Sequence, residues 1–293
     1  MQVHFWGVRG SIPVSGERFV KYGGNTTCIV FEHNGEFIIV DGGTGLKAFG
    51  DFCDGKALDA TLVFTHVHWD HIQGLPFFGP AFHPGSNIQV RGVSRDGWHF
   101  NNILSLQMTP PTFPVTLDIL GGIKGIEDFE VDKPYQIGSF TVQALEQNHP
   151  DGVVVYRVEA GGFKVVFATD VEHGGKGLDP RLVELCKDCD LIIHDAQYTE
   201  DEYHGRNGPP RKGWGHSMWE EAVQLAIDSN AKRLALFHHD PSRSDEGVDQ
   251  IEAQAQAIFS GSFASREHTT FDLASDSLLD SKGVKLSLGS AGK

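Results

Sequence analysis

Four side chains that can bind metal stand close together directly after an apolar segment of the sequence. Residues 62–65 form the apolar segment, and His66, His68, Asp70 and His71 follow it. Imidazole nitrogens and carboxylate oxygens are ligands for zinc, iron and manganese. One residue separates His66 from His68, so an extended or turned backbone can aim both rings at one ion. Asp70 and His71 follow where the chain turns and could face a second ion beside the first. A polar loop with satisfied histidines is the alternative, but the density of ligands favours a metal site.

Short apolar runs that end in Asp or His recur along the chain. Their length and their β-branched and aromatic residues predict buried strands at 37–40, 62–65, 165–169, 191–193 and 234–237. The polar residues that follow these runs are, in chain order, Asp41, His66, Asp170, His194 with Asp195, and His238 with His239. One such residue alone would indicate only a turn. Five strands that end in this way predict an active site along the edge of a sheet.

Helical patterns lie between the predicted strands. Residues 217–229 show an apolar stripe at helical spacing, and Ser217 with Glu220 forms the pattern of a capping box at its start. Residues 249–259 predict a further helix. Together with the strands, these helices are the elements that must position the Asp and His side chains.

The sequence is interpreted as one domain with a short C-terminal extension. It shows no internal repeat and no convincing linker, and 40% hydrophobic residues in a chain of 293 supply a large core. We assign residues 1–274 to the domain and residues 275–293 to the extension, which lacks a firm pattern and could be flexible. Residues 284–288 fit either a short strand or a loose tail.

Composition and charge exclude several classes of protein. Acidic residues outnumber basic ones by 39 to 24, which gives a net charge of −15 with neutral histidine. This charge disfavours a surface built for long nucleic acid, whose footprint is basic. The N-terminus has no signal-peptide pattern and no apolar run can cross a bilayer, so we expect a cytoplasmic protein without membrane contact. Cys186 and Cys189 form a lone C-x-x-C pair, and no second pair supports a metal or redox role.

The motif at residues 66–71 resembles the H-x-H-x-D-H signature of the metallo-β-lactamase superfamily. Asp41-Gly42-Gly43 matches the acidic strand end that precedes the signature in that family. Later strand ends offer the remaining ligands of the family in order, at His149, Asp170 and His238. The resemblance covers residues 3–273 and implies an α/β (α+β) fold, the four-layer αββα sandwich of two mixed sheets with helices outside.

The same resemblance implies two divalent metal ions per chain. His66, His68 and His149 would bind one ion, and Asp70, His71 and His238 the other, with Asp170 as the bridge between them. Open positions would then remain for water and substrate, as in catalytic sites. His239 competes with His238, which is favoured because it directly follows the strand, and Asp41 is expected to orient a ligand histidine. Zn²⁺ is the expected metal, with Mn²⁺ or Fe as alternatives.

Two further elements resemble the phosphodiesterase branch of the superfamily. Gly215-His216-Ser217 is similar to the G-H-S-T element of ribonuclease Z and related enzymes, and His194-Asp195-Ala196 to their H-E-A element, with Asp in place of Glu. The resemblance implies that His216 contacts phosphate or protonates the leaving group and that Asp195 orients it. Asp70 joins them as a catalytic residue, because a carboxylate near two metals serves chemistry more than packing. A helix-end histidine and a strand-end turn are the structural alternatives.

The resulting hypothesis is a metal-dependent phosphodiesterase that uses metal-activated water on a small substrate, such as a cyclic-nucleotide-type phosphodiester. One alternative is a nuclease of the ribonuclease Z type, although the long basic arm that grips transfer RNA has no counterpart here. Another is an ester, thioester or lactone hydrolase on the same metal core, which would not need His216 or Asp195. A non-enzymatic binding module would usually lack a ligand, and none is missing. A homodimer is left open.

Overall fold

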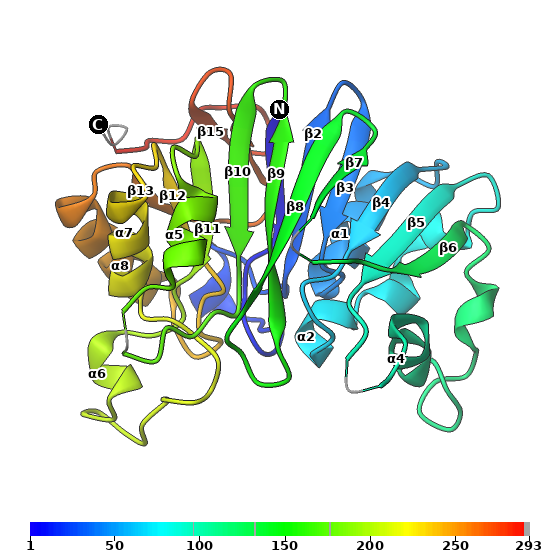
Figure 1. Ribbon diagram of the computed structural model, residues 1–293, viewed down its shortest axis with the longest axis horizontal. Coiled ribbons are helices and arrows are strands. Elements are labelled where there is room, and N and C mark those ends of the chain that lie inside the picture. Colours follow the sequence, from blue (N-terminus) through cyan, green and yellow to red (C-terminus); the bar gives the residue numbers. More distant parts are fainter. Residues whose placement is uncertain (96, 132, 176, 290–293) are drawn as a thin grey trace.

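The computed structural model describes residues 1–95, 97–131, 133–175 and 177–289, which form two facing β-sheets with helices outside (Figure 1). The first sheet contains, in spatial order, β15 (Ser277–Leu279), β14 (Thr269–Asp272), β1 (Gln2–Gly7), β2 (Cys28–His33), β3 (Glu36–Val40), β4 (Asp59–Val63), β5 (Asn87–Gly92) and β6 (Ile123–Asp128). The second contains β13 (Ser262–Ala264), β12 (Leu234–Phe237), β11 (Leu191–Asp195), β10 (Phe163–Ala168), β9 (Val153–Ala160), β8 (Phe140–Gln147) and β7 (Pro134–Ile137).

Helices cover the outer face of each sheet. The helices near the first sheet are α1 (Thr44–Phe52), α2 (Trp69–Ile72), α3 (Gly79–Phe82) and α4 (Phe100–Leu106). Those near the second are α5 (Pro180–Cys186), α6 (Glu200–Tyr203), α7 (Trp219–Asp228) and α8 (Asp245–Ile258). Helix α1 contacts β1 and β2, whereas α5 contacts β10 and α7 contacts β11 and β12. The layers therefore follow the αββα order, and the predicted fold is confirmed.

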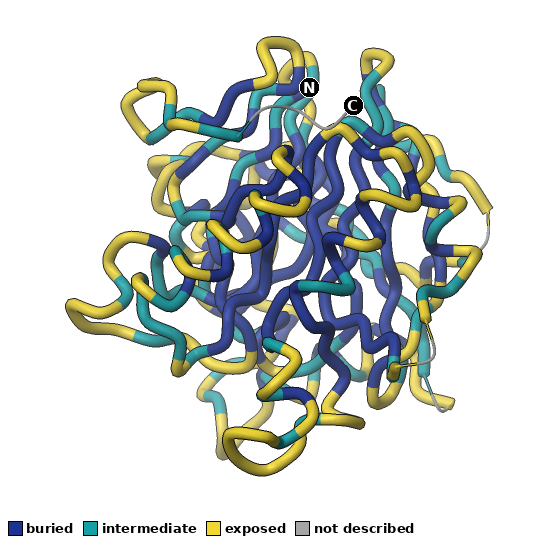
Figure 2. The backbone as a smooth tube through the Cα atoms, turned by 90° about the vertical axis from the view of Figure 1, so that its left-hand side faces the viewer, coloured by how far each residue is buried: buried dark blue, intermediate teal, exposed yellow. Residues whose placement is uncertain are grey.

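The main hydrophobic core lies between the two sheets. Phe5 and Phe31 of the first sheet join Tyr156, Phe167 and Phe237 of the second in one buried cluster. Separate clusters fill the spaces between each sheet and its helices. Buried segments accordingly run through the middle of the molecule and exposed loops surround them (Figure 2). This burial fixes the strands that carry the Asp and His residues at their ends.

Parallel pairing brings the predicted strand ends together. Strand β3 pairs in parallel with β4, and β10, β11 and β12 are parallel neighbours. Strand β8 runs in the same direction as β10 because both are antiparallel to β9. The carboxyl ends of parallel strands share one edge of a sheet, where open α/β folds place their ligands. All five strands predicted from the apolar runs are confirmed, with small shifts at their ends.

Both predicted helices are present, but their starts differ from the sequence interpretation. Helix α7 begins one residue later than its capping pattern implied, because the Glu221 carboxylate, and not Glu220, accepts the Met218 N–H at 3.1 Å. The Ser217 hydroxyl instead donates to the carbonyl of Val171, a contact outside the helix. Helix α8 begins earlier than predicted, where the Ser244 side chain accepts from the N–H of Gly247 at 3.3 Å.

Residues 275–289 pack against the sandwich. Strand β15 is antiparallel to β14 at the edge of the first sheet. Residues 284–288 form neither the strand nor the loose tail that the sequence suggested: Lys285 makes a single bridge to Leu279, and Leu286 and Leu288 contact the main core. Residues 290–293 of the predicted extension lie outside the described residues.

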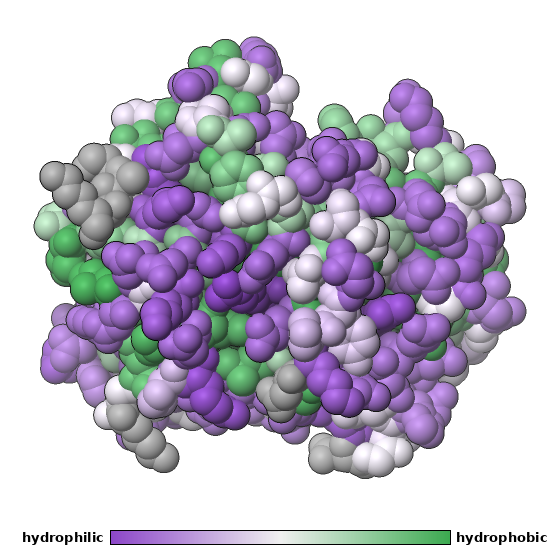
Figure 3. All heavy atoms as spheres, turned by 45° about the horizontal axis from the view of Figure 1, so that its top comes forward, coloured by the Kyte–Doolittle hydropathy of each residue, from purple (hydrophilic) through white to green (hydrophobic). Residues whose placement is uncertain are grey.

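The described helices are too short or too polar to serve as membrane spans. Hydrophilic side chains predominate on the face in Figure 3, and hydrophobic ones are scattered between them. The view combines the front and the top of Figure 1, whereas α2, which carries part of the metal-ligand motif, lies in the lower half of that figure.

Candidate metal centre

The structure brings the predicted metal ligands into two adjoining groups at one end of the sandwich. The ligand atoms within each group lie within 4.8 Å of one another. One group consists of His66, His68 and His149, and the other of Asp70, His71, Asp170 and His238. These groups correspond to the two ion sites that the sequence resemblance implied, with the residues divided in the same way.

Asp170 lies between the two groups, with one carboxylate oxygen toward each. Its Oδ2 is 3.8 Å from His66 Nε2 and 3.9 Å from His149 Nε2. Its Oδ1 is 3.3 Å from His71 Nε2 and 3.2 Å from His238 Nε2. A carboxylate in this position can serve two cations at once, which is the bridging role expected of Asp170.

Unpartnered nitrogen atoms indicate that the residues fit divalent metal ions. Within the described chain, the Nε2 atoms of His66, His71 and His238 are buried and have no hydrogen-bond partner. Buried polar atoms normally have a partner, and an ion is one reason for the exception. The other ring nitrogen, Nδ1, has a partner in each case. His66 Nδ1 lies 3.1 Å from Thr65 Oγ1 and His71 Nδ1 lies 2.8 Å from Asp41 Oδ2. His238 Nδ1 lies 2.9 Å from Gln197 Oε1. Each ring is thus held at Nδ1 and presents Nε2, as in metal-binding histidines.

Two residues that are not candidate ligands, Asp41 and Gly215, orient candidate ligand histidines. The Asp41 carboxylate accepts from the N–H of Thr65 at 2.7 Å as well as contacting His71. The carbonyl of Gly215 lies 2.8 Å from His149 Nδ1. A Cβ at Gly215 would stand 2.1 Å from that nitrogen, and its φ of +91° also favours glycine. The structure therefore supports the positioning role expected of Asp41.

Electrostatics at the centre favour bound positive charge. Burial by itself lowers the pKa of His71, but Asp70, Asp170 and Asp41 raise that pKa well above its ordinary value. Burial raises the pKa of the Asp170 carboxyl group, but His238 and His71 hold it well below its usual range. The carboxylates thus attract a proton onto a buried histidine, and a divalent ion can supply this charge in its place.

Backbone conformation at the strand ends turns three key side chains toward the centre. Asp41, Asp170 and His238 adopt left-handed φ angles of 64°, 55° and 59°. Such angles are uncommon outside glycine and cost about 1–3 kcal/mol when the surrounding structure imposes them. The chain therefore turns sharply at these three strand ends, beside the candidate site.

His216 and Asp195 form a hydrogen-bonded pair beside the two groups. Asp195 Oδ2 is 2.8 Å from His216 Nδ1, and Oδ1 of the same carboxylate accepts from the N–H of Gln197 at 3.0 Å. The His216 ring packs on His238 with 5.0 Å between ring centres. Burial lowers the pKa of His216, but Asp195, together with Asp170 and Asp70, more than offsets this and raises it to about 9. Asp195 thus occupies Nδ1 and leaves Nε2 as the atom that can face a substrate.

His239 lies outside the cluster that contains His238. Its Nε2 is 3.0 Å from the carbonyl of Ser265, and its ring contacts Tyr22. Burial and the nearby Arg9 lower the pKa of His239 to about 3, so the ring is neutral. Of the two candidates left open by the sequence, it is His238 that lies with Asp70, His71 and Asp170.

Glu172 is a site residue that the sequence analysis missed. This buried carboxylate accepts from the Tyr203 hydroxyl and the Gly213 N–H, both at 2.6 Å, and from the Gly215 N–H at 2.9 Å. It therefore fixes the loop that contains Gly215 and His216. The Gly215 carbonyl in this loop orients His149. No local pattern marks Glu172, because its partners are 31 to 43 residues away.

We expect Glu172→Gln to weaken metal binding about tenfold, the lower range for residues that orient ligands. The glutamine amide would direct N–H groups at backbone donors that need an acceptor, so the loop and the His149 ring would shift. Titration of the metal-free protein with Zn²⁺ measures the affinity. Glu200→Gln, at an exposed carboxylate on α6, is the control and should change affinity less than about twofold. Equal affinities for both variants would contradict the positioning role.

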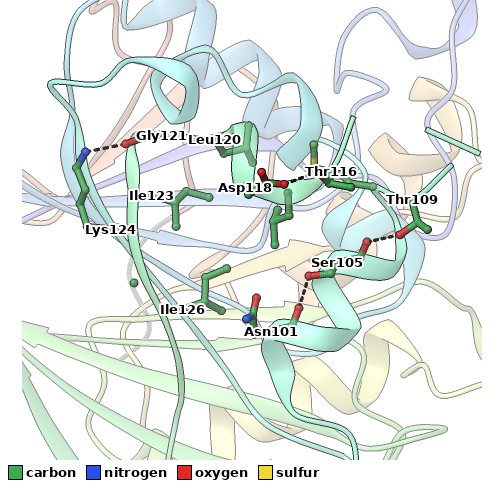
Figure 4. Close-up of a pocket in the computed structure, with 13 residues that line it drawn as sticks. Asn101, Ser105, Thr109, Thr116, Asp118, Leu120, Gly121, Ile123, Lys124 and Ile126 are labelled. Carbon is green, nitrogen blue, oxygen red and sulfur yellow. Dashed lines mark hydrogen bonds between the residues drawn. The ribbon is translucent and has the colours of Figure 1, made fainter. Parts of the chain in front are cut away.

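Other chemically suggestive features lie apart from this centre. A hollow of about 450 Å³ between α4 and β6 contains none of the predicted site residues (Figure 4). Its Lys124 ammonium donates to the carbonyls of Gly121 and Pro84 at 2.7 and 3.0 Å, so this charge is already bonded within the protein. Cys186 and Cys189 are free and buried, and burial raises the pKa of Cys189 to about 12, which keeps the thiol unreactive.

Known proteins resemble this chain over nearly its whole length. It is 23% identical to ribonuclease Z of Haloarcula marismortui, over 89% of this chain and 93% of the relative. It is 25% identical to the probable metallo-hydrolase YhfI of Bacillus subtilis, over 89% of this chain and 95% of YhfI. The crystal structure of YhfI matches with a TM-score of 0.69 at 20% identity, covering 92% of this chain and 97% of YhfI. The crystal structure of a diphosphatase of the PhnP family matches with a TM-score of 0.65 at 14% identity, covering 100% of this chain and 99% of the diphosphatase.

A family match then covers more than half of the sequence. The family described as "Beta-lactamase superfamily domain" matches residues 53–239. This span includes all the predicted metal ligands, together with Asp195 and His216. The family implies divalent metal ions, and the clustered histidines and aspartates fit them. The chain therefore belongs to the β-lactamase superfamily, as a hydrolase with the metallo-β-lactamase fold.

Proposed function

We propose that this hydrolase is a metal-dependent phosphodiesterase that cleaves a small phosphodiester. The observation that carries the proposal is the Asp195–His216 pair, which lies beside the candidate metal ligands with an Nδ1 to Oδ2 distance of 2.8 Å. Ester, thioester and lactone hydrolysis on the same metal core needs no such pair. The net charge of −15 favours a small substrate over long nucleic acid.

The residues divide the proposed work between holding metal and moving a proton. One divalent ion would be held by His66, His68 and His149. The other would be held by Asp70, His71 and His238, and Asp170 would bind both ions. Two such ions supply charge neutralisation at the phosphoryl group and a water nucleophile at neutral pH.

His216 would donate a proton from Nε2 to the leaving oxygen. Asp195 accepts the Nδ1–H of the same ring, which fixes the orientation of the imidazole and stabilises its charged form before the transfer. Asp195 is itself anchored, because its carboxylate accepts from the backbone N–H groups of Asp170 and Gln197 at 3.1 and 3.0 Å.

The names of the relatives support cleavage at phosphorus and keep a second substrate class in view. One relative is a ribonuclease Z and one structural neighbour a diphosphatase. Cleavage of RNA is the second candidate, favoured by the similarity to ribonuclease Z over 89% of this chain.

A substrate panel tests the proposal. Zn²⁺- or Mn²⁺-loaded protein should be assayed with bis-p-nitrophenyl phosphate, cyclic mononucleotides, cyclic dinucleotides, short RNA, a thioester and a lactone. We expect turnover of the small phosphodiesters at rates above those of the thioester and lactone. Turnover of RNA alone would favour the ribonuclease reading, and turnover of the lactone or thioester alone would overturn the phosphodiesterase assignment.

The proposed site also predicts a metal content of about two divalent ions per chain. Seven ligand residues in two adjoining groups provide for this number. Elemental analysis after purification without chelator measures the stoichiometry and shows whether zinc, manganese or iron is held. A value of zero, with no activity restored by added Zn²⁺ or Mn²⁺, would refute the dinuclear assignment.

A further inference from the structure

A loop beside the candidate centre holds an arginine between two aromatic rings. The Arg211 Cζ atom lies 5.0 Å from the centre of the Trp214 ring and 5.4 Å from that of Tyr198. Tyr198 is buried, whereas Trp214 is 54% exposed. Cation–π contacts on a planar guanidinium restrict its orientation, so its position is defined before any ligand arrives.

Contacts of Tyr198 place this guanidinium next to the proposed chemistry. The Tyr198 ring packs edge-on against His216, with 5.7 Å between ring centres. The Tyr198 hydroxyl accepts from Gln197 Nε2 at 3.2 Å, and Oε1 of the same amide lies 2.9 Å from His238 Nδ1. The Tyr198 ring is therefore all that separates Arg211 from His216, the proposed acid. Tyr198 and the Gln197 amide together link Arg211 to His238, a candidate metal ligand.

Arg211 also keeps capacity to bind an anion. Its ion pair with Asp240 spans 3.9 Å, beyond hydrogen-bond distance, and its side chain is 29% exposed. The neighbouring Arg243 is engaged differently, since its guanidinium donates to Glu202 at 2.6 Å and to the Gln197 carbonyl at 2.9 Å. A guanidinium has five N–H donors in a fork that matches phosphate oxygens.

We propose that Arg211 binds a second phosphate group of the substrate, on the flank of the phosphodiester that is cleaved. The inference rests on the proposed phosphodiesterase function and names its substrate class: a phosphodiester that also carries a phosphate monoester. With the leaving oxygen at His216, a group one aromatic ring away meets Arg211. The protein's net charge of −15 repels such a substrate, and a fixed cation beside the site offsets this repulsion locally.

Two cyclic phosphodiesters that differ by one phosphate test the inference. They are adenosine 2′,3′-cyclic phosphate and the same compound phosphorylated at the 5′ oxygen, so the leaving oxygen and the second phosphate belong to the same ribose. In the metal-loaded protein we expect the KM of the phosphorylated ester to be about tenfold lower, the effect of one charge-assisted contact. The preference should vanish in Arg211→Ala and survive in part in Arg211→Lys. Lys212→Ala, which removes the adjacent exposed charge, should behave as the wild type.

The outcomes separate this inference from the proposed function. Equal KM values for the two esters in the wild type, or a preference retained by Arg211→Ala, would overturn the role of Arg211 while leaving phosphodiesterase activity in place. Hydrolysis of neither ester would count against the proposed function instead. Calorimetry then decides on Arg211: adenosine 3′,5′-bisphosphate should bind about tenfold more tightly than adenosine 3′-monophosphate, and only when Arg211 is present. Equal binding in the wild type would refute the inference.

Discussion

Replacing Asp170 by asparagine should lower kcat on phosphodiesters on the order of a thousandfold, the upper range for loss of one electrostatic partner at a reacting centre. Asparagine has nearly the same size and tolerates the left-handed φ of 55° at this position, so the backbone should keep its path. The change removes the negative charge shared by the two ligand groups, whose histidine Nε2 atoms lie 3.2–3.9 Å from the carboxylate oxygens. Steady-state kinetics at saturating Zn²⁺ or Mn²⁺ measure kcat.

The same variant should hold fewer than two ions per chain, which elemental analysis records. Asp151→Asn is a matched control, because Asp151 also has a positive φ of 61° and its carboxylate lies 3.6 Å from His68 Nε2. Its side chain is 80% exposed, so we expect less than about a twofold change in kcat. Wild-type kcat together with two bound ions in Asp170→Asn would show that the carboxylate does not bridge. A thermal melt of both variants verifies that each is folded.

Local patterns in the sequence predicted the strands and the residues at their ends. Each of these strands is a short apolar run, and the residue after it stands where the chain must leave the sheet, as at Asp41, Asp170 and His238. The three residues share a left-handed φ, a conformation that a sequence pattern does not reveal. Which histidine of the pair 238–239 faces the centre depends on this turn of the backbone, and the sequence alone left both candidates open.

Residues that support the site through long-range contacts were not predictable in this way. Gln197 contacts His238 from 41 residues away, and Glu172 reaches Gly213 over the same separation. Their polarity alone is equally typical of surface loops, so only the closed fold distinguishes them. The start of α7 shows a related effect, because Ser217 fits a local capping pattern but bonds to the distant Val171 carbonyl instead.

The Asp195–His216 pair yields the second large effect that we expect. His216→Ala should lower kcat roughly a hundredfold on a phosphodiester with a poor, alkoxide leaving group, the scale of a lost general acid. The loss should be much smaller for a p-nitrophenyl ester, because p-nitrophenolate leaves without a proton. Asp195→Asn should show the same dependence on leaving group, since the aspartate acts through its contact with His216 Nδ1.

Metal content is the readout that separates proton donation by His216 from ligation. His216 Nδ1 lies 3.8 Å from Asp170 Oδ2, and His216 belongs to a further group of potential ligands with Asp170, Asp195 and His238. If His216 acts as the acid, the alanine variant keeps about two ions and loses rate mainly on poor leaving groups. Loss of an ion in that variant would make His216 a ligand, and equal losses on good and poor leaving groups would instead indicate phosphate positioning. His204→Ala, at an exposed histidine of the neighbouring loop, should leave both quantities unchanged and so excludes a general effect of removing an imidazole.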